Sequence, residues 1–545
     1  MAQAGYQGWT LTTAEDGLDR ISPSIAHADF LSSYVLGRKP AVFTSHFTDS
    51  LCRWTDLDYL NDKAGSSIVK VERLDTSTGG FGSGLPRLEM PFREFLAKLK
   101  AEGEEVEMYL TTQYDEEAET SKDNLPELFT CPPPCNALKD DFPLRPSILQ
   151  SLVPHQVNLW LGRSRAQSSK ASSSDEAIDW TQSHSSGLHH DHHDNLYVLL
   201  SGFKRFVLFP PSAHPHLAFY GSASGAQVYA NGVVAYEGDC MGPDALSARD
   251  RWGWETRRLQ RVVNELKKKR KKEKAATKGN LKFKLKGIGR QKTALEMELE
   301  IAEQALEDAE DKYLDAIGEE ALDGADMKDD FDALGDMLGG ADEGLTASGD
   351  GMDDASSVAE TASVAGSTSS RTTGKGKSKA REVDGVTEPP SFSKIPAYVL
   401  HTKLGLPSGS VPVSKSEEGS IGYEDADLKS LKPIVVYLEP GQMLYLPASW
   451  IHEVSSASRP RVSAPFQKRS RAECAGGDLA DVHMAFNYWF YPPDNIGDAN
   501  QKDTRGIYEM QELFDYLGSV IEERWKGSEE AASSGNASSK RMRMS

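Results

Sequence analysis

Two strongly apolar segments follow each other in residues 196–209, and they constrain the fold of this chain more than any other feature. LYVLLS and FKRFVLF are rich in leucine, β-branched and aromatic side chains, and Ser201-Gly202 separates them. Such runs are typical of buried strands, and the Ser-Gly break predicts a hairpin. Further strand-like runs lie at residues 157–162, 434–456 and 482–493. The pattern predicts a mainly β fold with flanking helices.

The strand pattern stops near residue 251 and resumes near residue 391. The intervening residues contain a basic part, a charged stretch with apolar positions at helical spacing, and an acidic part. Residues from about 345 to 385 are rich in Ser, Gly and Thr, a composition that predicts disorder. We therefore expect one β-rich domain that is interrupted by a long charged insertion, partly helical and largely disordered.

The same pattern divides the chain into five segments. An N-terminal part of mixed helix and strand is followed by the first half of the β domain, the insertion, the second half, and a C-terminal helix with a polar tail. The predicted boundaries are residues 1–150, 151–250, 251–390, 391–500 and 501–545.

The overall charge limits the partners to be expected. The chain has 61 Lys and Arg against 82 Asp and Glu, a net charge of −21, which is not typical of a general nucleic-acid binder. The basic run Lys267–Lys274 is a candidate contact for nucleic acid or for importin, or else the solvated end of a charged helix. The chain start does not resemble a signal peptide, and no apolar run is long enough to cross a membrane. We expect a nuclear and/or cytoplasmic protein without a membrane contact.

A cluster of four histidines and two aspartates, LHHDHHD, precedes the first apolar strand. A His and an Asp two positions apart on a strand point to the same face. With a third His, they form the two-histidine, one-carboxylate triad that binds Fe(II) and leaves open positions. His452, in MLYLPASWIHEV, is a candidate third ligand. The spacing allows two registers, which begin at His189 and at His192, and a polar histidine-rich loop is the alternative to a metal site.

The ordered motifs resemble those of the cupin-like jumonji-C family of 2-oxoglutarate oxygenases. The segments that carry the resemblance are LHHDHHDNLYVLLSGFKRFVLFPPS, GQMLYLPASWIHEVSS and MAFNYWFY, with FLSSYVLGRKPAVF, WTDLDYL, VNLWLG and PPSFSKI as flanks. The resemblance covers residues 25–250 and 390–525. It implies a double-stranded β-helix, also called a jelly roll. The nearest likeness is to small protein hydroxylases that act on lysyl side chains.

The resemblance also selects the register and assigns site residues. In the family, a lysine that binds 2-oxoglutarate follows the first ligand His by fifteen residues, and Lys204 stands fifteen residues after His189. This implies that His189, Asp191 and His452 hold Fe(II). For 2-oxoglutarate, the family pattern implies contacts from Lys204, Tyr109, Ser186, Asn195 and Asn487.

The implied function is a dioxygenase that uses Fe(II), 2-oxoglutarate and O₂ to hydroxylate a protein side chain, with lysyl as the expected type. Two alternatives share this chemistry: a lysine demethylase and a tRNA-modifying hydroxylase. An alternative of another class is a non-catalytic scaffold that binds partners through the charged insertion.

The last predicted helix carries a broad apolar stripe. Its members are Ile507, Met510, Leu513, Phe514, Leu517, Ile521 and Trp525. The breadth of the stripe predicts a homodimer contact, and packing against the β domain is the alternative.

Overall fold

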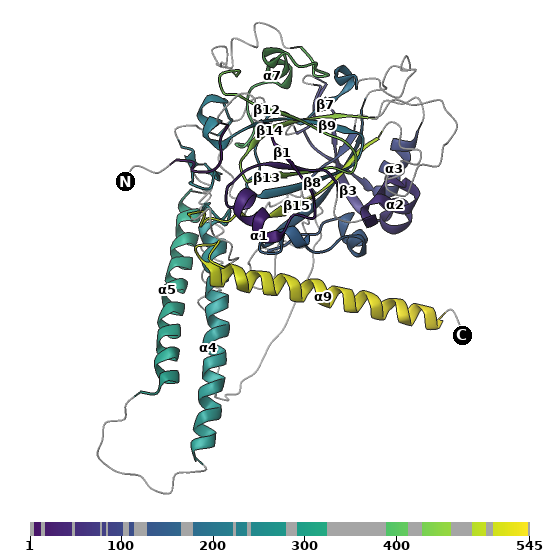
Figure 1. The fold of residues 1–545 in the computed structure, drawn as a ribbon. Helices are drawn as coiled ribbons and strands as arrows, with labels where there is room; N and C mark the ends of the chain where they lie inside the picture. The colour runs from purple at the N-terminus through teal and green to yellow at the C-terminus, as the bar shows by residue number, and fades with distance from the viewer. Residues whose placement is uncertain are drawn as a thin grey trace, which may run out of the picture.

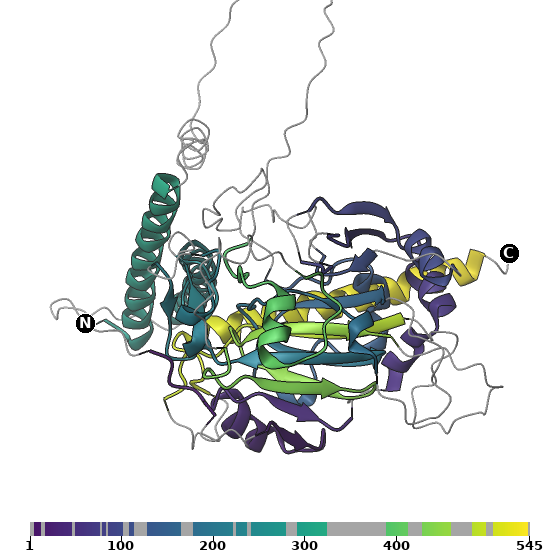
Figure 2. The same ribbon diagram turned by 90° about the horizontal axis from the view of Figure 1, so that it is seen from above.

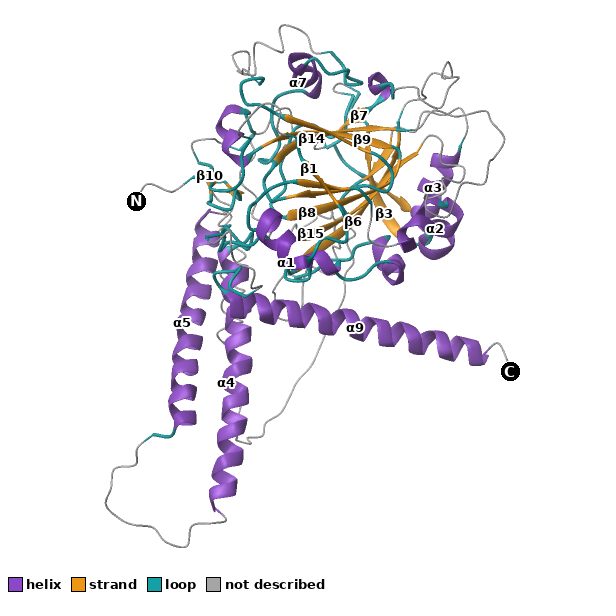
Figure 3. Ribbon diagram, viewed as in Figure 1, coloured by secondary structure: helices purple, strands orange, loops and turns teal. Residues whose placement is uncertain are grey.

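The chain folds around two β-sheets that face each other, as the computed structural model shows (Figure 1, Figure 3). The structure describes residues 5–11, 17–45, 49–76, 79–82, 85–101, 108–113, 128–164, 178–221, 225–236, 241–278, 292–323, 389–412, 428–458, 482–497 and 505–542. Both sheets contain strands from before and after the insertion.

Within the described residues, the larger sheet has nine strands in the order β1-β2-β13-β8-β15-β6-β5-β3-β4. Their bounds are Asp19–Ile21 (β1), Ala41–Phe43 (β2), Ile68–Arg73 (β3), Leu88–Pro91 (β4), Met108–Leu110 (β5), Pro154–Arg163 (β6), Asp194–Ser201 (β8), Met443–Leu446 (β13) and Val482–Phe490 (β15). The smaller sheet has the order β12-β9-β14-β7, with bounds Ile434–Leu438 (β12), Phe203–Phe209 (β9), Ile451–Ala457 (β14) and His184–Ser185 (β7). Gln227–Val228 (β10) and Val234–Ala235 (β11) pair separately.

Apolar side chains from both sheets fill the space between them. Leu199 and Leu444 of the larger sheet pack with Phe206, Leu208 and Val454 of the smaller one. The inward positions alternate along each strand, because successive side chains of a strand point to opposite faces. The predicted jelly roll with flanking helices is therefore confirmed.

The predicted hairpin between the first two apolar strands is wrong. Strand β8 pairs with β13 and β15, whereas β9 pairs with β12 and β14, so the two strands belong to different sheets. Gly202 turns the chain between them with a φ of 74°, in the left-handed region that favours glycine. Every residue of β8 is buried, and a strand that is apolar on both faces carries no local sign of its partner.

Helices cover the outer faces of the two sheets. On the larger sheet these are α1 (His27–Phe30), the π-helical η1 (Leu31–Val35), α2 (Leu57–Ala64), α3 (Phe92–Lys100), α9 (Gln511–Met542) and the short 3₁₀ turns η2 (Asp49–Thr55), η3 (Cys135–Asp141) and η4 (Ser147–Leu149). On the smaller sheet they are α7 (Ala397–Leu404) and the 3₁₀ turn η6 (Pro211–His216), while η5 (Trp180–Gln182) precedes β7. None of the helices in the described parts of the chain is both long and apolar enough to span a bilayer.

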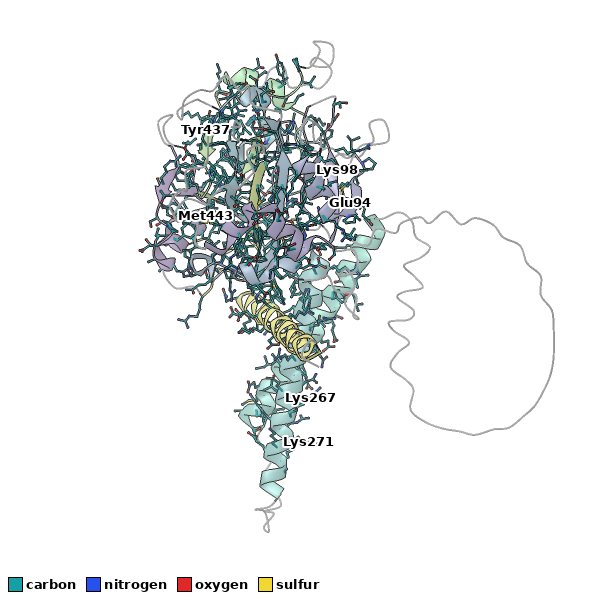
Figure 4. All side chains as sticks on the ribbon, turned by 90° about the vertical axis from the view of Figure 1, so that its right-hand side faces the viewer. Glu94, Lys98, Lys267, Lys271, Tyr437 and Met443 are labelled. Atoms are coloured by element: carbon teal, nitrogen blue, oxygen red, sulfur yellow. The ribbon has the colours of Figure 1, made fainter. Side chains whose placement is uncertain are left out.

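The insertion begins with two long helices that form an arm beside the barrel. Helix α4 (Ala248–Lys278) and helix α5 (Ala294–Asp323) pack along each other and bury Val263, Leu266 and Leu299 between them. The arm projects away from the sheets, and Lys267 and Lys271 lie on its outer part (Figure 4). The stretch that is predicted to be disordered, residues 345–385, lies outside the described residues.

Helix α9 runs across the outer face of the larger sheet (Figure 1, Figure 2). Its residues Phe514, Leu517 and Ile521 are at most 3% exposed and belong to the main hydrophobic core of the single chain. Met510 and Trp525 pack against the same core. The apolar stripe is thus buried against the core of its own chain. The homodimer contact stays a prediction, but the stripe is not an exposed surface that would support it.

Candidate metal centre

Three side chains from two distant parts of the sequence meet at one end of the barrel. One ligand atom each of His189, Asp191 and His452 lies within 4.8 Å of the other two. His189 and His452 are direct antiparallel partners, since each backbone N–H donates to the carbonyl of the other, at 3.0 and 2.7 Å. The sequence pattern suggested that His189 and Asp191 lie on a strand. They lie instead in the connection before β8. The connection before β8 and the beginning of β14 therefore assemble the triad.

Backbone carbonyls orient both imidazole rings of the triad. Nδ1 of His452 lies 2.8 Å from the carbonyl oxygen of Trp450, and Nδ1 of His189 lies 3.1 Å from that of Gly187. A carbonyl only accepts, so each Nδ1 carries a proton, and in a neutral ring Nε2 then keeps the lone pair that a metal can take. Burial, followed by the neighbouring His189, lowers the pKa of His452 to about 4. Both conditions favour the neutral imidazole that a metal requires.

The second register of the histidine cluster does not reach this point. The carboxylate of Asp194 is fully buried and accepts hydrogen bonds from the guanidinium of Arg38 at 2.6 and 2.9 Å. It also accepts from the hydroxyl of Tyr445 at 2.6 Å and from the amide of Ala448 at 2.8 Å. His193 stacks on His155, with ring centroids 3.8 Å apart. Asp194 therefore anchors the fold, and Asp191 is the carboxylate beside the two histidines.

The chain that returns from the insertion covers one side of the triad. The ring of Phe392 stacks on the ring of His189 with centroids 4.9 Å apart and planes 10° apart. The backbone of this segment is held in place, because His190 N–H donates to Ser391 O and Ser393 N–H donates to Leu188 O. Phe392 lies in the flanking segment PPSFSKI, and an aromatic residue directly after the insertion is the only sequence signal for its role.

A buried lysine marks the second part of the site. Lys204 is 1% exposed, and its Nζ lies 2.5 Å from Ser456 Oγ and 3.2 Å from Tyr109 Oη. Burial lowers the pKa of Lys204 to about 7, because a low-dielectric environment disfavours the charged amine. An anion placed beside Nζ would relieve this penalty. Ser456 was missed by sequence reasoning, although it lies on the same face of β14 as His452, four residues away.

The remaining candidate residues are hydrogen-bonded within the chain. Ser186 Oγ accepts from the amide of Val454 and donates to Gly187 O, and so ties the loop that carries His189 to β14. Asn487 Nδ2 donates to Asn195 Oδ1 at 3.0 Å, and Asn487 Oδ1 accepts from Trp160 Nε1 at 2.9 Å. The roles of Ser186, Asn195 and Asn487 toward a co-substrate stay predictions.

Comparisons with known proteins agree with this arrangement. A family model described as a Cupin-like domain matches residues 27–496. The chain is 33% identical over 485 residues to "JmjC domain-containing protein 4" of Schizosaccharomyces pombe, which covers 86% of this chain and 83% of that protein. It is 27% identical over 231 residues to "Lysine-specific demethylase JMJ31" of Arabidopsis thaliana, which covers 37% of this chain and 38% of that protein.

Proposed function

Because the chain belongs to the cupin-like JmjC domain family, we propose that it is an Fe(II)- and 2-oxoglutarate-dependent oxygenase that hydroxylates a lysyl side chain of a protein. The observation that carries the proposal is the joint presence of the triad and, inside the same barrel, the buried Lys204. A metal site alone would fit many functions, whereas a triad with a buried lysine in the same barrel fits a metal together with an anionic co-substrate.

The residues present fit the groups that the family implies. Two imidazoles and one carboxylate match the donor set of the Fe(II) facial triad. The far carboxylate of 2-oxoglutarate needs a cation and hydroxyl donors, and Lys204, Tyr109 and Ser456 supply them. When bound, Fe(II) with 2-oxoglutarate and O₂ supplies the oxidation of an unactivated C–H bond, and the protein supplies position and electrostatics.

The chain itself contributes orientation and exclusion of water. Backbone carbonyls hold the two imidazoles with Nε2 directed to the metal position, and Phe392 covers the outer side of His189. His452 and Lys204 are almost completely buried. A dry site strengthens each electrostatic contact that the protein makes.

The proposal is tested by turnover of 2-oxoglutarate. Purified protein with Fe(II), O₂ and candidate lysine-bearing proteins should form succinate, and mass spectrometry of the substrate should detect the gain of one oxygen atom. The matched control is Asp191→Ala, which should abolish both signals while the protein stays folded. A wild type that binds metal but never consumes 2-oxoglutarate with any substrate would refute the proposal, and would favour the non-catalytic scaffold.

A lysine demethylase is the second candidate, because one relative carries that name. Hydroxylation of an N-methyl carbon is the same chemistry, and the product then loses formaldehyde. The same mass spectra separate the two functions, since a demethylase removes a methyl group from a methylated lysine and leaves an unmethylated lysine unchanged.

We further propose that the basic run Lys267–Lys274 on α4 directs the chain to the nucleus. Lys267, Lys268, Lys269 and Lys271 are exposed on the projecting arm (Figure 4), where an importin can reach them. Replacement of these four lysines by alanine should move a fluorescent fusion from the nucleus to the cytoplasm. An unchanged nuclear signal would refute the proposal.

A further inference from the structure

A row of three residues crosses the larger sheet at the end where Lys204 lies. Tyr109 of β5 is the direct cross-strand partner of Gly162 of β6, and Gly162 is the direct partner of His483 of β15. Directly paired residues of neighbouring strands place their side chains on the same face. The side chains of Tyr109 and His483 therefore stand on one face with a glycine between them.

Gly162 lets the two rings meet. A Cβ at this position would lie 2.5 Å from Cδ2 of Tyr109 and 3.0 Å from Cε1 of His483. Both rings lean into the space above the glycine, with centroids 5.4 Å apart. A side chain at position 162 would push the rings apart, so the glycine serves their contact.

A second row crosses the smaller sheet opposite the first. Lys204 of β9 pairs with Ser456 of β14, and Ser456 pairs with His184 of β7. The two rows meet where Lys204 Nζ donates to Tyr109 Oη, at 3.2 Å. The charge of Lys204 also acts on His483, because after burial it is the largest influence that lowers the pKa of that imidazole. One cation is thus surrounded by hydroxyls and by histidine from both sheets.

His483 is buried without a use for its polar atoms. It is 1% exposed, and neither ring nitrogen has a hydrogen-bond partner among the residues that the structure describes. A buried polar group without a partner destabilises a fold, and native structures keep few of them. The imidazole stays neutral here, because burial and then Lys204 lower its pKa. A neutral imidazole always carries one N–H, so His483 can donate to an anion.

We propose that His483 is a co-substrate-binding residue, whose N–H donates to the same far carboxylate of 2-oxoglutarate that pairs with Lys204. This inference rests on the proposed function. A carboxylate offers about four acceptor positions, and Lys204, Tyr109 and Ser456 leave room for a further donor. The site then selects a 2-oxo acid with a second carboxylate over one that ends in a methyl group.

The test compares two ligands and three proteins. Calorimetry with the Mn(II)-loaded protein measures the affinity for 2-oxoglutarate and for 2-oxopentanoate, which has the same carbon chain with a methyl group in place of the far carboxylate. The proteins are the wild type, His483→Leu and His483→Gln. His483→Leu should lower the affinity for 2-oxoglutarate by about tenfold to a hundredfold, as expected for a hydrogen bond to a charged group. It should leave the affinity for 2-oxopentanoate unchanged. His483→Gln retains an N–H donor and should recover part of the affinity.

A second measurement separates binding from a structural role. If His483 is kept for the ligand, replacing its unpartnered imidazole by Leu should leave the melting temperature of the ligand-free protein unchanged or raise it. The inference would be overturned if His483→Leu had a lower melting temperature and lost affinity equally for both ligands. It would also be overturned if His483→Leu bound 2-oxoglutarate with wild-type affinity. A wild type that binds Mn(II) but not 2-oxoglutarate would overturn the proposed function as well.

Discussion

Replacing the carboxylate by an amide at Asp191 and at Asp194 should have different effects. The first change should abolish metal binding, and the second should destabilise the fold. Asp191→Asn removes the negative ligand of the candidate metal centre, and Asp194→Asn removes the negative partner of the buried Arg38. Both aspartates belong to an HxD triplet of the histidine cluster, and spacing alone does not distinguish them. The pair of variants therefore tests which triplet binds metal and which one holds the fold together.

The loss of unfolding free energy expected for Asp194→Asn follows from the contacts of the Asp194 carboxylate. The carboxylate accepts two hydrogen bonds from Arg38, one from Tyr445 and one from Ala448, and the Arg38 and Asp194 side chains are fully buried. Breaking a buried pair from one side leaves an uncompensated charge and costs about 3–5 kcal/mol. For a domain of several hundred residues, each kcal/mol lowers the melting temperature by about 1–2 °C. We therefore expect Asp194→Asn to melt about 3–10 °C lower than the wild type.

Asp191 is in a different environment, because its side chain is 25% exposed and the ionisable group beside it among the described residues is Nε2 of His452, at 3.7 Å, whose pKa burial lowers. Asp191→Asn should change the unfolding free energy of the metal-free protein by no more than about 0.5 kcal/mol, but abolish metal binding. Scanning calorimetry of the metal-free proteins and titration of Mn(II) into the folded proteins measure the two effects. An Asp194→Asn variant that melts like the wild type, or an Asp191→Asn variant that still binds Mn(II), would refute the reasoning.

Four further results are expected. Lys204→Met should lower the affinity for 2-oxoglutarate a hundredfold or more, because loss of one side of a buried charge pair costs about 3–5 kcal/mol. Unchanged affinity in calorimetry would contradict this. In the wild type, affinity should fall as pH rises above the pKa of Lys204, about 7, since the anion pairs only with the protonated amine, and Lys204→Arg should remove this dependence. Phe392→Ala should weaken Mn(II) binding by about tenfold or more, as for other residues that orient a ligand, with Phe392→Tyr as the conservative control that retains it. Leu517→Ala should lower the unfolding free energy by about 2–5 kcal/mol and leave the mass in light scattering unchanged, whereas a fall to half that mass would restore the homodimer contact.

The elements of this fold could be predicted wherever their signal is local. The spacing of Phe92, Phe95, Leu96 and Leu99 predicts helix α3, and the structure buries these four residues. The apolar run at residues 157–162 predicts a strand that became β6. Periodicity depends only on neighbours within a few positions, so it can be read without knowing the fold.

The pairing of elements was the part that local patterns predicted wrongly or left open. Apolar residues on both faces of β8 show that the strand is buried, but not that its neighbours are β13 and β15 instead of β9. The stripe of α9 shows that one face must be covered, but not whether the cover is a second copy or the barrel. Burial stabilises an apolar surface whichever apolar surface covers it, so the apolar pattern does not identify the packing partner.

The sequence determined the candidate triad, His189, Asp191 and His452, and the candidate anion-binding Lys204, through the resemblance of its ordered motifs to the family pattern. Only the tertiary structure decided that Asp194 pairs with Arg38, that Ser456 lies beside Lys204, and that His483 meets Tyr109 above Gly162. Each of these contacts joins residues far apart in the chain. Such contacts depend on strand order and register, and a shift of one residue in register turns a side chain to the other face of the sheet. Register is set by the packing of the whole barrel, so no local stretch of sequence contains it.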